Sequence, residues 1–144
     1  SVWRWLRARQ FASSNNKVNE RKGALMEPFL ILQVSTYLFG IAALGGVVMA
    51  LIRFTSGGNP PSWLAMLHGF LAAAGLTLLA YAVATMEVPA LAVLSLLLFF
   101  GGAIGGIVLN LHYHLRDLAL PKWLVVVHAL VSVLALAMLV MAAF

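Results

Sequence analysis

Four histidines are the residues in this chain whose type and spacing could support chemistry. Two of them occupy the same place in a repeated stretch: PSWLAMLH ends at His68, and PKWLVVVH ends at His128, sixty residues later. The other two, His112 and His114, stand shortly before the second copy. Imidazole binds haem iron and also copper, zinc and non-haem iron. A matched pair of histidines in two helices is therefore the first candidate for a cofactor site.

The segments that carry these histidines are apolar enough for lipid. Of the 144 residues, 63 % are hydrophobic and 9 % are charged, whereas about a quarter of the residues of a soluble domain are charged. Four segments each hold roughly 20 or more apolar residues, enough to cross a hydrocarbon core of about 30 Å. Prolines at or beside their starts favour helix initiation. We expect an all-α, four-helix transmembrane bundle with up-down-up-down topology in residues 27–144, its helices at about 28–53, 62–86, 89–111 and 122–144.

Residues 1–26 form a separate basic N-terminal region. SVWRWLRARQF mixes Trp3, Trp5 and Leu6 with three arginines, as in an amphipathic helix that lies on an anionic membrane surface. The following ASSNNKVNERKG, residues 12–23, is polar, and we expect it to be extended. Two interpretations of this arm stay open, a solvated tail that follows the positive-inside rule and an arm that lies along a partner subunit.

Lysine and arginine predict how the bundle is oriented. The N-terminal region holds six of them, and the connection between the second and third helices holds none. The positive-inside rule then places both termini in the cytoplasm and the first and third connections outside. We expect an integral protein of a bacterial inner membrane, with the four histidines toward its outer face.

His68 and His128 suit the two axial positions of one b-type haem. Each lies about 9 Å below the start of its helix, at 1.5 Å per residue, so they are at matched depth. Small residues on the same faces would let a flat ring lie against the helices, and outward-facing propionates would meet arginine at the outer side. The expected cofactor-binding residues are therefore His68, His128, Gly75, Ser132, Arg53 and Arg116, with the two ligand histidines on the haem iron.

His112 and His114 are harder to assign, because residues two apart on a helix point about 200° from each other. One of them could bind a second haem, donate to a propionate or contact a quinone. A non-haem metal site built from three or four of the histidines is a rival interpretation. Histidines that only hydrogen-bond across the bundle are another, and a simple interfacial position is the expected assignment of both His112 and His114. The chain has no cysteine, which excludes thiolate metal sites and covalently attached haem.

The fragments LHGFLAAAGLTLLAY and KWLVVVHALVSVLALAML resemble helices of the cytochrome b561-type superfamily. The run HYHLRDLALPKWLVVVH also resembles small bacterial integral membrane proteins of unassigned function, with His68, His114 and His128 at the matching positions. The resemblance implies that histidines early in apolar helices bind b-type haem. Such proteins have more helices and a second haem at the opposite face, for which this chain offers no histidine.

The sequence therefore predicts a haem-binding electron-transfer subunit rather than an enzyme by itself. Its expected partners are membrane lipids, other subunits of a membrane complex, and a quinone or a periplasmic redox protein, with no nucleic acid. The main alternative is a cofactor-free structural or accessory subunit of a respiratory or photosynthetic complex. The two differ in whether His68 and His128 face each other or face a partner and lipid.

Overall fold

The chain is almost entirely helical. The computed structural model describes residues 2–144, except for the side chains at positions 5, 8, 12, 21, 22 and 24–26. No strand occurs in this part of the chain, and four of its helices are long and apolar enough to cross a membrane. The predicted all-α class with four apolar helices is thus confirmed. The elements are α1 (Val2–Thr55), α2 (Ser62–Thr85), α3 (Ala90–Ile107), the π-helix η1 (Val108–Tyr113), the 3₁₀ turn η2 (His114–Arg116) and α4 (Lys122–Ala143).

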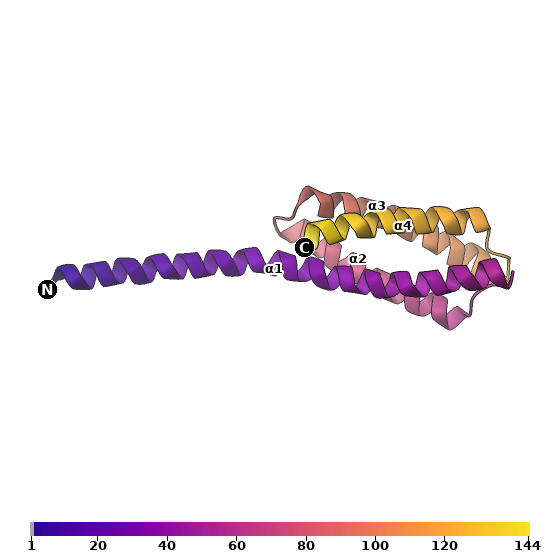
Figure 1. Ribbon diagram of the computed structural model, residues 1–144, viewed down its shortest axis with the longest axis horizontal. Helices are drawn as coiled ribbons and strands as arrows, with labels where there is room; N and C mark the ends of the chain where they lie inside the picture. The colour runs from indigo at the N-terminus through magenta and orange to yellow at the C-terminus, as the bar shows by residue number, and fades with distance from the viewer. Residues whose placement is uncertain (1) are drawn as a thin grey trace.

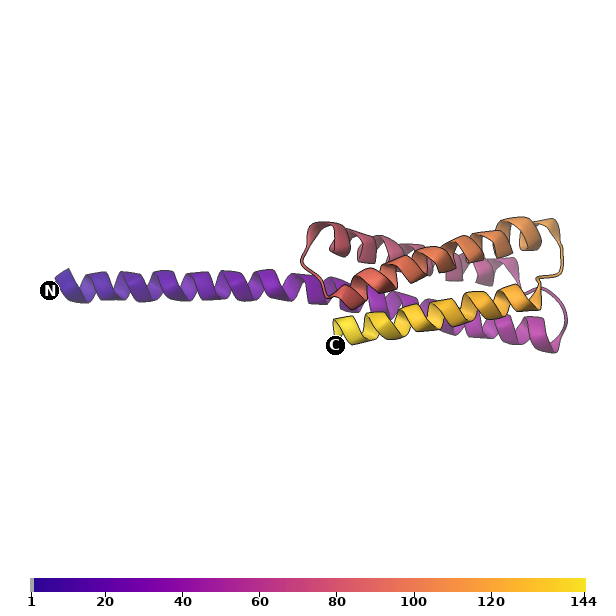
Figure 2. The same ribbon diagram turned by 90° about the horizontal axis from the view of Figure 1, so that it is seen from above.

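The four apolar helices lie side by side, and short connections join each to the next (Figure 1). In Figure 1 the pair α3–α4 lies above the pair α1–α2, and in Figure 2, seen from above, α3 and α4 lie in front of α1 and α2. The first part of α1 extends alone beyond the other three helices (Figure 1). All of the packing that could position a site therefore involves residues from Glu27 onward.

The structure corrects the expected start of the first helix. α1 begins at Val2 and continues through Pro28, so residues 12–23 are helical and the expectation of an extended segment is wrong. Between Trp3 and Glu27 the chain has one glycine, Gly23, and no proline, and Asn16 donates one turn ahead to Glu20. A polar composition without a helix breaker does not prevent a helix. The side chains of Trp5, Arg21 and Lys22, on which the predicted arm partly depends, lie outside the described residues.

Proline starts the other three helices, as the sequence indicates. Pro61, Pro89 and Pro121 are the N-cap residues of α2, α3 and α4, with φ between −58° and −68°. Their carbonyls accept the first backbone bonds of the new helix, for example from Leu64 and Ala65 to Pro61. The fixed φ of proline suits a helix start, where its missing N–H costs little.

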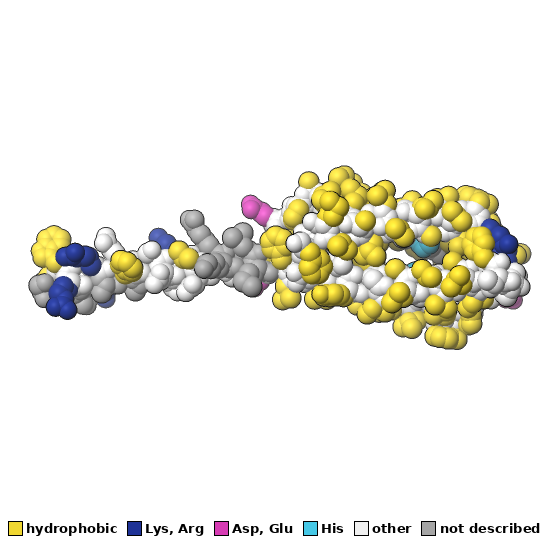
Figure 3. All heavy atoms as spheres, viewed as in Figure 1, with side chains coloured by type: hydrophobic (Ala, Val, Ile, Leu, Met, Phe, Trp, Pro, Cys, Tyr) yellow, Lys and Arg dark blue, Asp and Glu magenta, His cyan; other side chains and the backbone are white. Residues whose placement is uncertain are grey.

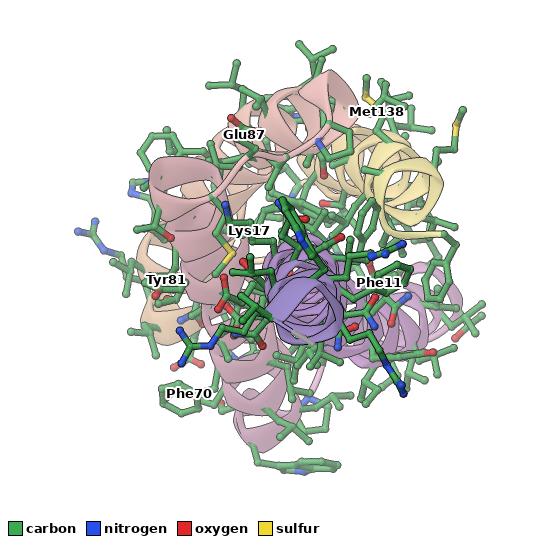
Figure 4. The ribbon with its side chains drawn as sticks, turned by 90° about the vertical axis from the view of Figure 1, so that its left-hand side faces the viewer. Phe11, Lys17, Phe70, Tyr81, Glu87 and Met138 are labelled. Carbon is green, nitrogen blue, oxygen red and sulfur yellow. The ribbon has the colours of Figure 1, made fainter. Side chains whose placement is uncertain are left out.

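Large apolar side chains cover the outside of the bundle, and its inside holds small residues beside a few leucines and two phenylalanines. Figure 3 shows hydrophobic side chains over most of the visible face of the four helices, with Lys or Arg at the right-hand end of the bundle. Phe70 and Tyr81 point outward in the view along the bundle (Figure 4) and are more than half exposed. Inside, Ser35, Ser95 and several alanines are fully buried. Small residues at helix contacts are typical of bundles in lipid, because they let backbones approach closely.

The two helix pairs repeat each other with an offset of sixty residues. Ser35 of α1 donates to the carbonyl of Gly75 in α2 at 2.8 Å, and Ser95 of α3 donates to the carbonyl of Ala135 in α4 at the same distance. The connections also match, since Gly57 and Asp117 both have a positive φ, 71° and 54°. We call residues 27–84 the first half and residues 87–144 the second half.

Equivalent residues of the two halves also contact each other. The rings of Phe39 and Phe99 are stacked, and the rings of His68 and His128 meet edge to face. A residue that touches its own equivalent must lie close to a two-fold axis. The halves are therefore related by an approximate two-fold axis that runs along the bundle, as in parallel repeats of membrane proteins.

Candidate cofactor site

His68 and His128 face each other across the interior of the bundle. Their ring centroids are 6.2 Å apart, and the ring planes cross at 72°. His68 lies in the second turn of α2 and His128 at the same place in α4, so the matched depth that the sequence predicts is present. Histidine atoms are visible between the helices in Figure 3. The two-fold relationship of the halves brings the pair together.

Each of the two imidazoles is anchored to a backbone carbonyl of the neighbouring helix in its own half. The Nδ1 atom of His68 lies 2.8 Å from the carbonyl oxygen of Ala42, and that of His128 lies 2.9 Å from the carbonyl oxygen of Gly102. A carbonyl can only accept, so each Nδ1 must carry the hydrogen. In the neutral ring Nε2 then keeps its lone pair, and among the described residues Nε2 has no hydrogen-bond partner.

This arrangement is the one expected of metal-ligating histidines. A ligating imidazole usually donates its other N–H to a carbonyl or carboxylate, which fixes the tautomer and the ring orientation. Here both rings meet that condition through backbone groups. One ligand atom would therefore come from each half.

Glycines on α1 and α3 form the walls against the histidines. A Cβ added at Gly46 would lie 3.3 Å from Cε1 of His68, and one at Gly106 would lie 3.3 Å from Cε1 of His128. A Cβ added at Gly45 would lie 3.8 Å from Cβ of His68, and one at Gly105 would lie 3.7 Å from Nδ1 of His128. Glycine permits this close approach of backbone and ring. The site is therefore made of two histidines from one diagonal pair of helices and two GlyGly pairs from the other.

These residues fit a haem better than a bare metal ion. Within the described part of the chain, no group of three or more His, Cys, Asp or Glu side chains is placed to hold a metal ion. The interpretation of a non-haem site from three or four histidines thus has no support in the geometry. A haem needs only two axial ligands, because the macrocycle supplies the remaining nitrogens.

The end of the bundle that carries the first and third connections ties the two halves together. Arg53, which the sequence suggests for a propionate, donates from Nε to the carbonyl of Leu120 at 2.8 Å and from Nη1 to the carbonyl of Gly57. The amide nitrogen of Asn59 donates to the carbonyl of Leu118 at 2.8 Å, and its oxygen accepts from the N–H of Leu120 at 3.1 Å. Part of the guanidinium is therefore occupied in joining the first connection to the third.

The structure separates His112 and His114 from the histidine pair. His114 is buried, its Nε2 lies 3.1 Å from the hydroxyl of Ser62, and its Nδ1 has no partner. His112 is exposed and packs edge to face on Tyr113 at 4.9 Å. Arg116 is exposed in η2. The change from α-helix to π-helix at Val108 turns the end of α3 and lets one of the two histidines point inward.

Gly75 and Ser132 lie near the site but not against the histidine rings. A Cβ at Gly75 would meet the ring of Phe39 at 3.1 Å, so this glycine makes room for the aromatic stack. The hydroxyl of Ser132 lies close to Gly102, where a Cβ would be 3.3 Å from its oxygen. Ser132 thus packs beside the carbonyl that anchors His128.

Sequence reasoning singled out the glycines of GGAIGG, residues 101–106, for close approach of a cofactor, but it missed the full repeat, with its serines and the equivalent glycines at 45 and 46. Aligning residues 27–84 with 87–144 without a gap gives 16 identities in 58 positions. They include Ser35 and Ser95, Phe39 and Phe99, and both GlyGly pairs at 45–46 and 105–106.

Comparison with protein-family models, with curated proteins and with solved structures found no match.

Proposed function

We propose that this chain is an integral membrane subunit that binds b-type haem, with His68 and His128 as the two axial ligands. One observation carries the proposal: both imidazoles bond a carbonyl through Nδ1, which leaves both Nε2 atoms without a hydrogen-bond partner among the described residues, and the two ring centroids lie 6.2 Å apart. The resemblance to cytochrome b561-type helices agrees with this function.

In this proposal the chain's own residues bind and tune the cofactor. Ala42 and Gly102 orient the ligand rings through their carbonyls, Gly46 and Gly106 leave the space, and the Phe39–Phe99 stack closes the next layer of the bundle. Bound haem would supply one-electron redox chemistry, which the axial ligands, their hydrogen bonds and burial adjust.

The position of the histidines also suggests where electrons enter and leave. We place both termini in the cytoplasm of a bacterial inner membrane and the histidine pair toward the outer face, following the lysine and arginine distribution. Helix positions nearer the inner face carry no histidine, so a single haem would exchange electrons within the outer half. A quinone in the membrane and a periplasmic redox protein are the partners of suitable chemistry, within a larger complex.

The test is a reduced-minus-oxidised absorption spectrum of the purified full chain, with haem quantified as its pyridine haemochrome. We expect a b-type α-band that is lost in both His68→Ala and His128→Ala. His112→Ala is the matched control, because His112 is exposed and lies outside the pair. Its spectrum should equal that of the unaltered chain.

A reduced-minus-oxidised spectrum without an α-band, from protein expressed with ample haem and purified in mild detergent, would contradict the proposal. The matched histidines would then act only as bridges between helices, and a cofactor-free accessory subunit would be the better description. Equal loss of haem in the His112→Ala control would also count against a specific bis-histidine site.

A further inference from the structure

Contacts at two atoms of each ring fix the planes of His68 and His128. On one edge, Nδ1 donates to a helix carbonyl at 2.8 or 2.9 Å. At Cε1, the neighbouring atom of the ring, each histidine faces a glycine. Gly46 lies against His68 and Gly106 against His128, and a Cβ on either glycine would be 3.3 Å from Cε1. Each ring is thus fixed by contacts to the other helix of its own half.

Because the two rings are related by a two-fold axis, they tilt by equal amounts in opposite directions, and their planes cross. A rotation about an axis along the bundle carries a ring tilted to one side into a ring tilted to the other side. The angle between the planes is therefore twice the tilt of each ring. The repeat makes the two tilts equal, and the tilt that the contacts impose on each ring sets the observed crossing of 72°.

We infer that Gly46 and Gly106, together with the carbonyls of Ala42 and Gly102, are positioning groups that keep the two axial imidazoles of the proposed haem nearly perpendicular. The inference rests on the proposed function and adds to it the electronic state of the iron. Each imidazole raises the energy of one of the two iron d orbitals that can mix with its π system. Perpendicular rings raise both orbitals equally, whereas parallel rings raise one and split the pair.

The state of the iron is read directly by electron paramagnetic resonance of the oxidised full chain at low temperature. Nearly degenerate orbitals give a low-spin ferric signal with one strongly low-field feature, and split orbitals give a rhombic three-line signal. We expect the single low-field feature. A rhombic signal from haem-loaded protein would overturn the inference and leave the proposed function standing.

Two variants test the glycines themselves. Gly46→Ala and Gly106→Ala place a methyl 3.3 Å from Cε1 of His68 and His128, so the ring must turn by a small amount. We expect the low-field feature to shift in both, and to shift further in the double variant, while haem remains bound. Gly40→Ala and Gly101→Ala are the controls in the same helices, because a Cβ there meets nothing within 4 Å.

An unchanged signal in Gly46→Ala and Gly106→Ala at full haem content would show that the glycines do not set the ring planes. If either variant loses haem, the electron paramagnetic resonance signal of the unaltered chain still tests whether the two imidazole planes are nearly perpendicular. Absence of haem from the unaltered chain would overturn the inference and the proposed function together.

Discussion

Phe39 and Phe99 stand sixty residues apart in the chain, and their rings stack with centroids 3.6 Å apart and planes 2° from parallel. Both side chains are buried, one in each half of the repeat. Because equivalent residues meet here, the stack lies on the approximate two-fold axis. The stack forms the layer of the bundle next to the histidine pair and joins the two halves through contact between the rings.

The Phe39–Phe99 stack should appear as a coupling in a double-mutant cycle. Replacing each ring by leucine, alone and together, should give a coupling of about 0.5–1.5 kcal/mol in the free energy of unfolding, since aromatic pairs contribute that much beyond their burial. The measurement is a detergent-denaturant titration of the purified chain. Phe70 and Phe100, which are 66 % and 61 % exposed, serve as the control pair and should show no coupling.

Gly75→Ala should destabilise the bundle. The added Cβ would lie 3.1 Å from two ring atoms of Phe39, and Phe39 cannot retreat because Phe99 lies behind it. Overpacking of this kind costs about 1–3 kcal/mol, which we expect to exceed the gain of about 1 kcal/mol from replacing glycine by alanine in a helix. The same titration gives the result.

Gly69→Ala is the matched control in the same helix, because a Cβ at Gly69 meets nothing within 4 Å. It should be neutral or slightly stabilising. If Gly75→Ala behaves like Gly69→Ala, the ring of Phe39 must have room that the structure does not give it.

Asn59→Ala should loosen the third connection, which joins α3 to α4. The substitution removes the bonds from Asn59 to the carbonyl of Leu118 and from the N–H of Leu120 to Asn59, each of which contributes about 0.5–1.5 kcal/mol. We expect faster hydrogen exchange at the amide of Leu120, measured by mass spectrometry on peptides that cover this connection. Thr55→Ala, which removes only a bond to Leu51 within α1, should leave that exchange rate unchanged.

Cysteine labelling can test the proposed orientation, because the natural chain contains no cysteine. Ser56→Cys lies in the first connection and Glu87→Cys in the second, and both positions are exposed. In intact cells a membrane-impermeant maleimide should label Ser56→Cys at once, and Glu87→Cys only after permeabilisation. The reverse pattern would contradict the orientation that lysine and arginine predict.

The site could be predicted only in part, and the reason is geometric. Position along a helix is readable from a sequence, so the equal depth of His68 and His128 is evident from PSWLAMLH and PKWLVVVH. Direction around a helix is not readable here, because spans that face lipid are apolar on every side and show no marked core face. For that reason Gly75 was expected beside a cofactor, although it lies against Phe39.

Composition and length determined by themselves that this chain forms four apolar helices, since a polypeptide in lipid must satisfy its backbone internally. The sequence also determined where three of them begin, because proline fixes φ and lacks the N–H that a helix interior needs. Only the tertiary structure decided that the histidines meet at 6.2 Å, that Nδ1 of each bonds a carbonyl, and that His114 is buried while His112 is not. Those contacts depend on how two equivalent halves rotate and pack against each other, which small residues permit but do not specify alone.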